Sequence, residues 1–129
     1  MAKPFLKWAG GKTQLIEQIE KSIPESFHHQ PFTYIEPFSG SAAVFFWMQE
    51  KFPNMEKAVL NDINIELIDC FKVIKNNVSE LIDILKNWES EFHDFDDDLD
   101  LKKEYYYKKR TQFNSRESSK ILQSALFIF

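Results

Sequence analysis

The first half of the chain alternates between two spacings of its apolar residues. Leucine and isoleucine recur at helical spacing over residues 15–23, and Pro24 ends that pattern. Residues 32–36, Phe-Thr-Tyr-Ile-Glu, are aromatic and β-branched, which predicts a short strand. A helix, a second short strand and a third helix are predicted next, at residues 42–51, 58–60 and 65–74. Alternation of this kind predicts right-handed crossovers, a parallel sheet and therefore an α/β fold.

The second half carries helical spacing only, and no strand is predicted after Leu60. The predicted helices cover residues 78–88 and 101–113, with the acidic loop Asp94–Asp100 between them. Asn114, followed three residues later by Glu117, resembles a capping box and predicts the start of a last helix. We therefore divide the chain into an α/β subdomain at residues 1–75 and a helical subdomain at residues 76–129.

The chain ends on an apolar stretch. Residues 125–129, Ala-Leu-Phe-Ile-Phe, contain neither a polar cap nor a glycine stop. A natural terminus is usually polar and frayed, so this pattern is typical of a helix that is cut in its middle. We therefore expect the chain to be a fragment of a longer protein.

The composition narrows the possible classes of protein. The 129 residues are 43% hydrophobic and carry a net charge of −4, so an attraction for DNA would have to come from a local patch. Cys70 is the single cysteine, and no Cys/His spacing resembles a metal site. The longest apolar run, residues 42–48, is far shorter than the roughly 20 residues of a membrane span. We expect a cytoplasmic protein that uses neither a metal nor a membrane.

The strongest local signal is a loop that joins a strand to a helix. Glu36-Pro37-Phe38-Ser39-Gly40-Ser41 ends the first strand, and a helix that starts there exposes unpaired N–H groups. Asp62 ends the second strand 22 residues after Gly40, a spacing at which an acid binds a ribose in dinucleotide-binding folds. The single glycine leaves little room for a pyrophosphate, which favours a nucleoside cofactor without phosphates. A simple turn beside an unrelated surface acid stays open as the alternative.

A second candidate is Trp8-Ala9-Gly10-Gly11-Lys12. The two glycines permit a tight turn, and Lys12 at a helix start places a cation where a carboxylate can bind. Trp8 offers a flat face for a sulfonium or an adenine. The alternative is that Trp8 belongs to the core and Lys12 is a solvated surface charge.

These motifs together resemble those of Dam-type DNA adenine-N6 methyltransferases. Residues 5–12, Phe-Leu-Lys-Trp-Ala-Gly-Gly-Lys, are similar to the N-terminal cofactor motif of that family. Residues 36–41 resemble its Glu-Pro-Phe loop, and residues 61–64, Asn-Asp-Ile-Asn, resemble its strand-end acid motif. The three occur in the order of the family, and the resemblance extends more loosely through residues 75–129.

The resemblance implies a Rossmann-like S-adenosylmethionine-dependent methyltransferase fold with a partial parallel sheet, followed by part of a helical DNA-recognition subdomain. It implies that Trp8, Ala9 and Lys12 hold the methionine end of S-adenosylmethionine and that Asp62 holds the ribose. Glu36, Phe38 and Gly40 would form the loop side of the site. Lys7 would face the partner, double-stranded DNA with a flipped adenine.

The sequence departs from the family in two places. Its loop reads Phe-Ser-Gly-Ser, where the family more often has more glycine. The catalytic Asp-Pro-Pro-Tyr motif is absent, because the sequence contains no Pro-Pro pair, and no catalytic residue is assigned. We therefore expect the chain alone to be inactive. A non-catalytic remnant that binds cofactor or DNA is the first alternative.

Three other patterns are weaker. Gly11-Lys12-Thr13 could belong to a P-loop, but Leu6 stands where that motif needs a glycine, so nucleotide binding is the weaker alternative. The acidic loop does not match an EF-hand. Basic residues and tyrosines are interleaved over residues 102–110, which fits a DNA-facing patch and a solvated helix face equally well.

Overall fold

The computed structural model describes residues 3–129, and these form two compact units. The first unit ends at Ile63, and the second comprises Asn64–Phe129. The sequence-based division at residue 75 lies instead inside the first helix of the second unit. The assignment of cofactor binding to residues 1–75 and of DNA recognition to residues 76–129 stays a prediction.

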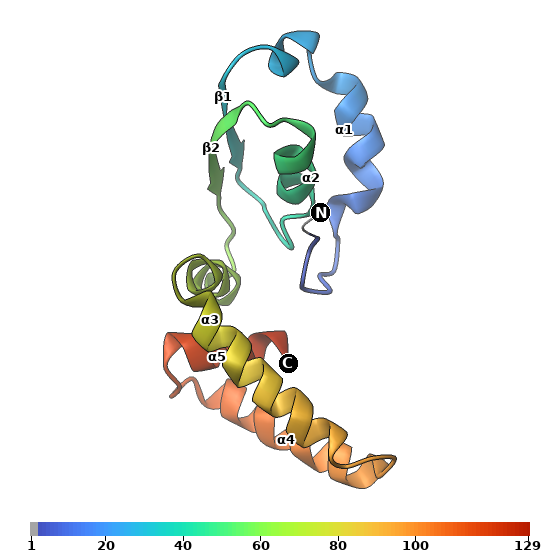
Figure 1. Ribbon diagram of the computed structural model, residues 1–129, viewed down its shortest axis with the longest axis vertical. Helices are drawn as coiled ribbons and strands as arrows, with labels where there is room; N and C mark the ends of the chain where they lie inside the picture. Colours follow the sequence, from blue (N-terminus) through green and yellow to red (C-terminus); the bar gives the residue numbers. More distant parts are fainter. Residues whose placement is uncertain (1–2) are drawn as a thin grey trace. The chain divides into compact units, whose positions relative to one another are not determined.

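The first unit is a mixed α/β unit (Figure 1). Its elements, in chain order, are η1 (Lys12–Leu15), α1 (Ile16–Ser22), η2 (Glu25–His28), β1 (Phe32–Glu36), α2 (Ala43–Lys51) and β2 (Met55–Leu60). The helix–strand order predicted from the sequence is confirmed. Both η segments are 3₁₀ helices, and the first leads directly into α1.

Strands β1 and β2 pair in parallel, as predicted. Glu36 is aligned with Leu60, and Ile35 with Val59, so both strands end at the same edge of the sheet. Strand β2 begins at Met55, three residues before the predicted start. The part of the chain that the structure describes contains this one two-stranded sheet.

The core of the first unit lies between the sheet and α2. Val44, Met48 and Phe52 are buried, and partly buried residues of α1 and β1 pack against them. Those residues include Ile19 and Tyr34. The packing of this face of α2 therefore holds the start of the helix near the sheet, and with it the loop that connects β1 to α2.

The second unit consists of three helices: α3 (Ile65–His93), α4 (Leu99–Ser115) and α5 (Lys120–Ile128). The two helices predicted between residues 65 and 88 form one element, α3, with a kink at Asn77, whose φ is −138° and ψ 32°. No helix among residues 3–129 is both long enough and apolar enough to span a membrane.

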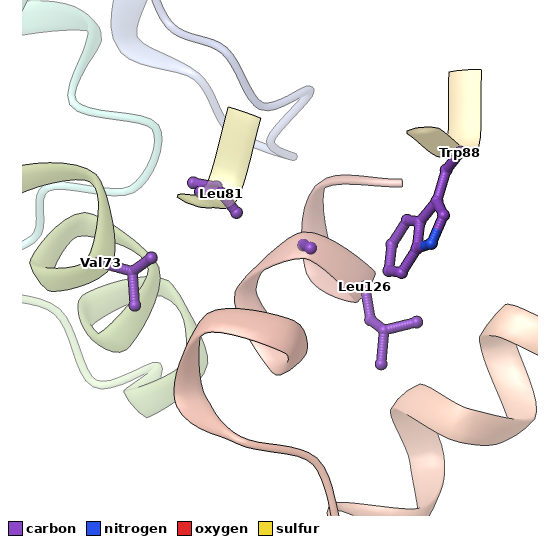
Figure 2. Packing of buried hydrophobic residues seen from close by; sticks show 5 residues of the cluster. Val73, Leu81, Trp88 and Leu126 are labelled. Carbon is purple, nitrogen blue, oxygen red and sulfur yellow. The ribbon is translucent and has the colours of Figure 1, made fainter. Parts of the chain in front are cut away.

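Helices α3 and α5 enclose the core of the second unit. Figure 2 shows Val73, Leu81 and Trp88 of α3 with Leu126 of α5. Ala125, at 0% exposure, completes this buried cluster. The apolar segment at residues 125–128 is therefore largely covered by α3.

Polar side chains cap all three helices, and one cap differs from the prediction. Asn64, Asp98 and Ser119 accept hydrogen bonds from backbone N–H groups of the first turns of α3, α4 and α5. The capping box predicted at Asn114 is wrong, because α4 continues through Ser115 and α5 starts only after Ser119.

Candidate functional site

The loop between β1 and α2 is tied to the end of β2 by three hydrogen bonds. The Gly40 amide donates to Oδ2 of Asp62 over 2.9 Å. The Ser39 amide donates to the Asn61 carbonyl over 2.9 Å, and the Asn61 amide donates to the Glu36 carbonyl over 2.9 Å. The parallel pairing of the two strands thus continues beyond their ends and brings Asp62 under the loop.

Gly40 is required for both its backbone angle and its small size. Its φ is +50°, a left-handed conformation that favours glycine. A Cβ atom on this residue would lie 3.1 Å from Cδ1 and 3.4 Å from Nε1 of Trp8. The Trp8 indole therefore lies directly against the loop, although 31 residues of chain separate the two positions.

The Gly-Gly turn after Trp8 brings Lys12 toward the same loop. The Gly11 amide donates to the Trp8 carbonyl over 3.2 Å, and Gly10 has a φ of +75°. Lys12 Nζ then donates to Glu36 Oε1 over 3.2 Å and to the Phe38 carbonyl. The predicted cation thus lies beside the loop as part of an ion pair.

Glu36 is 7% exposed, and both of its carboxylate oxygens have a donor. Oε1 accepts from Lys12, and Oε2 accepts from the Tyr34 hydroxyl over 2.8 Å. Burial, followed by the hydrogen bond to Glu36 and the charge of that carboxylate, raises the pKa of Tyr34 above its ordinary value. The Tyr34 hydroxyl therefore keeps its proton and acts as a donor.

Two side chains of the loop have opposite environments. Phe38 is 76% exposed, so its ring is available to a ligand. Ser39 is buried, and its hydroxyl has no hydrogen-bond partner among residues 3–129. Phe38 is therefore the side chain that the loop presents to solvent, whereas the Ser39 side chain is enclosed by the unit.

The structure brings together most of the residues predicted from the sequence. Contacts with the loop or within it join Trp8, Lys12, Glu36, Gly40 and Asp62. Ala9 and Lys7 are exposed positions on either side of Trp8. The sequence reasoning missed Tyr34, although side chains two residues apart on a strand share a face, which places it beside Glu36.

A cavity in the same unit lies apart from these residues. It has a volume of about 660 Å³, and its lining includes Ile16, Phe46 and Trp47. None of the predicted cofactor contacts lines it. We therefore assign the candidate site from the chemistry of the loop and not from this cavity.

A comparison with known families identifies the chain. The sequence pattern of the D12 class of N6 adenine-specific DNA methyltransferases matches residues 8–129. The chain belongs to this family. The match begins at Trp8 and includes the loop and the strand-end acid, so the resemblance predicted from the three motifs is confirmed.

Curated relatives agree with this assignment. The chain is 42% identical over 130 residues to the type II methyltransferase M.MjaIII of Methanocaldococcus jannaschii, covering 98% of the chain and 44% of that protein. It is 40% identical to the type II methyltransferase M1.LlaDCHI of Lactococcus lactis, covering 84% of the chain and 32% of that protein. It is 38% identical to the DNA adenine methylase of Haemophilus influenzae, covering 98% of the chain and 39% of that protein. The chain thus spans less than half the length of each of these relatives.

In the second unit, much of the basic and aromatic segment is engaged in contacts of its own. Lys109 Nζ lies 3.8 Å from the centroid of the Trp88 ring and 4.9 Å from that of Tyr105. Lys108 pairs with Glu104 over 3.0 Å, and Lys102 lies over the Phe92 ring. Lys102 and Lys109 thus lie against aromatic rings of the same unit, whereas the side chain of Lys108 stays 72% exposed.

The burial of Lys109 lowers its pKa, an effect that the charge of Glu91 partly opposes. The hydroxyl of Tyr105 donates to Oε2 of the same glutamate over 2.5 Å. Lys109 and Tyr105 therefore form one packed group with Trp88 and Glu91. The part of the chain that the structure describes contains no cluster of three or more potential metal ligands.

Proposed function

We propose that the first unit binds S-adenosylmethionine and is the cofactor-binding part of a Rossmann-like DNA adenine-N6 methyltransferase. The observation that carries this proposal is the convergence of three distant motifs on one loop. Trp8 lies against Gly40, Lys12 contacts Glu36 and the Phe38 carbonyl, and Asp62 accepts from the Gly40 amide. The family assignment gives this convergence a chemical meaning.

The residues present fit the chemical groups of S-adenosylmethionine. Lys12 has three donors, two of which are used by Glu36 and the Phe38 carbonyl, so one remains for the carboxylate of the methionine end. An ionised carboxylate such as Asp62 offers about four lone-pair sites, so accepting from Gly40 is compatible with binding ribose hydroxyls as well. The indole of Trp8 offers a flat face at the methionine end, and the exposed ring of Phe38 supplies apolar surface on the loop side of the site.

The bound cofactor would supply an activated methyl group on a sulfonium. The substrate in this proposal is an adenine flipped out of double-stranded DNA, with Lys7 and part of the helical unit near the DNA. The 129 residues lack the Asp-Pro-Pro-Tyr motif that supplies the acceptors and the stacking ring in the family. We therefore propose that this chain alone binds cofactor without methylating DNA, and that it acts in the cytoplasm.

Calorimetric titration with S-adenosylmethionine tests the cofactor site. The variant Asp62→Ala should weaken binding roughly 10- to 100-fold, the effect of losing hydrogen bonds to a charged group. Asp83→Ala, at an exposed carboxylate of α3, is the matched control and should bind like the wild type. Binding of ATP with magnesium but not of S-adenosylmethionine would favour the P-loop alternative and contradict the proposal.

A separate assay tests the expected lack of activity. The purified chain is incubated with DNA and methyl-labelled S-adenosylmethionine, and label on adenine is measured. We expect no transfer above a reaction without protein. Detectable transfer would show that residues 1–129 contain catalytic groups of their own and would contradict the proposal.

A further inference from the structure

Tyr34 contacts the Glu36 carboxylate and belongs to none of the three motifs. Its hydroxyl donates to Oε2 over 2.8 Å, while Lys12 Nζ donates to Oε1 over 3.2 Å. Glu36 is buried, so each of its oxygens needs a donor to offset the loss of water. The two donors therefore share the carboxylate, one on each oxygen.

The position of the Tyr34 ring is fixed by packing. It is partly buried against Val44, Met48 and Phe52, and it stacks on Phe45 with a centroid distance of 6.5 Å and an interplanar angle of 28°. Its hydroxyl stays protonated, because burial and the neighbouring carboxylate raise the pKa of Tyr34. This hydroxyl is consequently a fixed donor, whereas Lys12 is a flexible one whose side chain is 33% exposed.

We propose that Tyr34 is a positioning residue that aims Lys12 at the carboxylate of the cofactor through Glu36. With Oε2 occupied by Tyr34, Glu36 meets Lys12 through Oε1 alone. The ammonium then contacts one carboxylate oxygen and the Phe38 carbonyl, and its third hydrogen stays available for the methionine end. This inference rests on the proposed binding of S-adenosylmethionine.

Removing the hydroxyl should change this arrangement without changing the core. In Tyr34→Phe the ring keeps its packing, but Oε2 loses its donor, so Glu36 draws Lys12 across both oxygens. Fewer N–H groups of the Lys12 ammonium then remain to donate to the carboxylate of the cofactor. We expect the dissociation constant of S-adenosylmethionine to rise about fivefold, less than the loss of a direct hydrogen bond to a charged group would give, because Lys12 is displaced and not removed.

A pair of ligands separates positioning from a purely structural role. 5′-Methylthioadenosine keeps the adenosine and the sulfur but lacks the carboxylate that Lys12 would bind. Tyr34→Phe should therefore leave its dissociation constant within about twofold of the wild-type value. Equal weakening of both ligands, or no weakening of either, would overturn the role of Tyr34.

Two further variants complete the experiment. Tyr107→Phe, at an exposed tyrosine of α4, is the matched control and should change neither affinity. In a Lys12→Met background, Tyr34→Phe should have no additional effect on S-adenosylmethionine, because the residue through which it acts is gone. An additional fivefold loss there would overturn the proposed route through Lys12.

The outcomes also separate this inference from the proposed function. If the folded wild-type chain, checked by circular dichroism, does not bind S-adenosylmethionine, both fail. If the wild type binds it and Tyr34→Phe weakens the two ligands equally, only the inference on Tyr34 fails. Unequal weakening with no additional effect in the Lys12→Met background supports both.

Discussion

Replacing Gly40 by alanine is the most direct test of the way the loop is built. An alanine there keeps a φ near the +50° of the glycine only at a cost of about 1–2 kcal/mol, the penalty of the left-handed region for an L-residue. Its Cβ would also lie 3.1 Å from Cδ1 of Trp8, so the indole must shift by a few tenths of an ångström. We expect Gly40→Ala to lower the free energy of unfolding of the first unit by about 2–3 kcal/mol.

Gly10 provides an internal control. It also has a positive φ, +75°, but a Cβ placed there meets no heavy atom within 4 Å. Gly10→Ala should therefore cost only the backbone strain, about 1–2 kcal/mol. The difference between the two variants isolates the contact between Gly40 and Trp8.

Urea denaturation followed by circular dichroism measures both changes, and calorimetric titration measures the affinity for S-adenosylmethionine. Because the displaced Trp8 indole belongs to the proposed cofactor site, Gly40→Ala should weaken binding more than Gly10→Ala does. Equal losses of stability and of affinity in the two variants would refute the reasoning, because the close approach of Trp8 would then have no energetic effect.

Three further predictions concern the second unit. Leu126→Ala should lower the free energy of unfolding by about 2–5 kcal/mol, because it opens a cavity in the α3–α5 core, and urea denaturation measures this change. Ser119→Ala should cost about 1 kcal/mol in the same assay through loss of the α5 cap. Burial raises the pKa of Cys70 to about 11 from 9.0, against a smaller lowering by a hydrogen bond with Ser124, so the thiol ionises more readily in the unfolded chain. The contribution of the protonated Cys70 thiol to the free energy of unfolding is therefore complete below pH 9 and is lost as the pH rises to 11. The free energy of unfolding of the wild type should therefore fall more than that of Cys70→Ala over this interval, as urea denaturation at several pH values measures.

The predicted and observed elements differ where local sequence competes with packing. The sequence identified β1 with its observed bounds, because four of its five residues are aromatic or β-branched. Strand β2 was predicted too short, because Glu56 and Lys57 are polar and exposed. The exposed start of the strand lacks the apolar run on which the prediction depended, and Met55 and Lys57 belong to the strand because they pair with Phe32 and Thr33 of β1.

In the helical unit, too, the sequence pattern misplaces the ends of elements that packing decides. The spacing of apolar residues predicted two helices, at residues 65–74 and 78–88, yet the backbone bends at Asn77 and continues as α3. At the other end, Asn114 and Glu117 match a capping box, but the side chain that caps α5 is Ser119, which accepts from the amide of Leu122. A short polar motif occurs by chance in such a segment, and the packing of α5 on α3 decides where the helix starts.

The predicted site residues lie close together because their positions depend on one another physically, and their binding roles stay a prediction. The left-handed φ of Gly40 turns its amide toward Asp62, and its missing side chain admits the indole of Trp8. The turn after Trp8 then carries Lys12 to Glu36, the last residue of β1. A change in any one of these residues removes a contact of another, so the combination of three short motifs carries far more information than each motif separately. Tyr34 lies outside that combination, since its link to Glu36 depends only on the alternation of side chains along a strand, and many residue types satisfy that alternation.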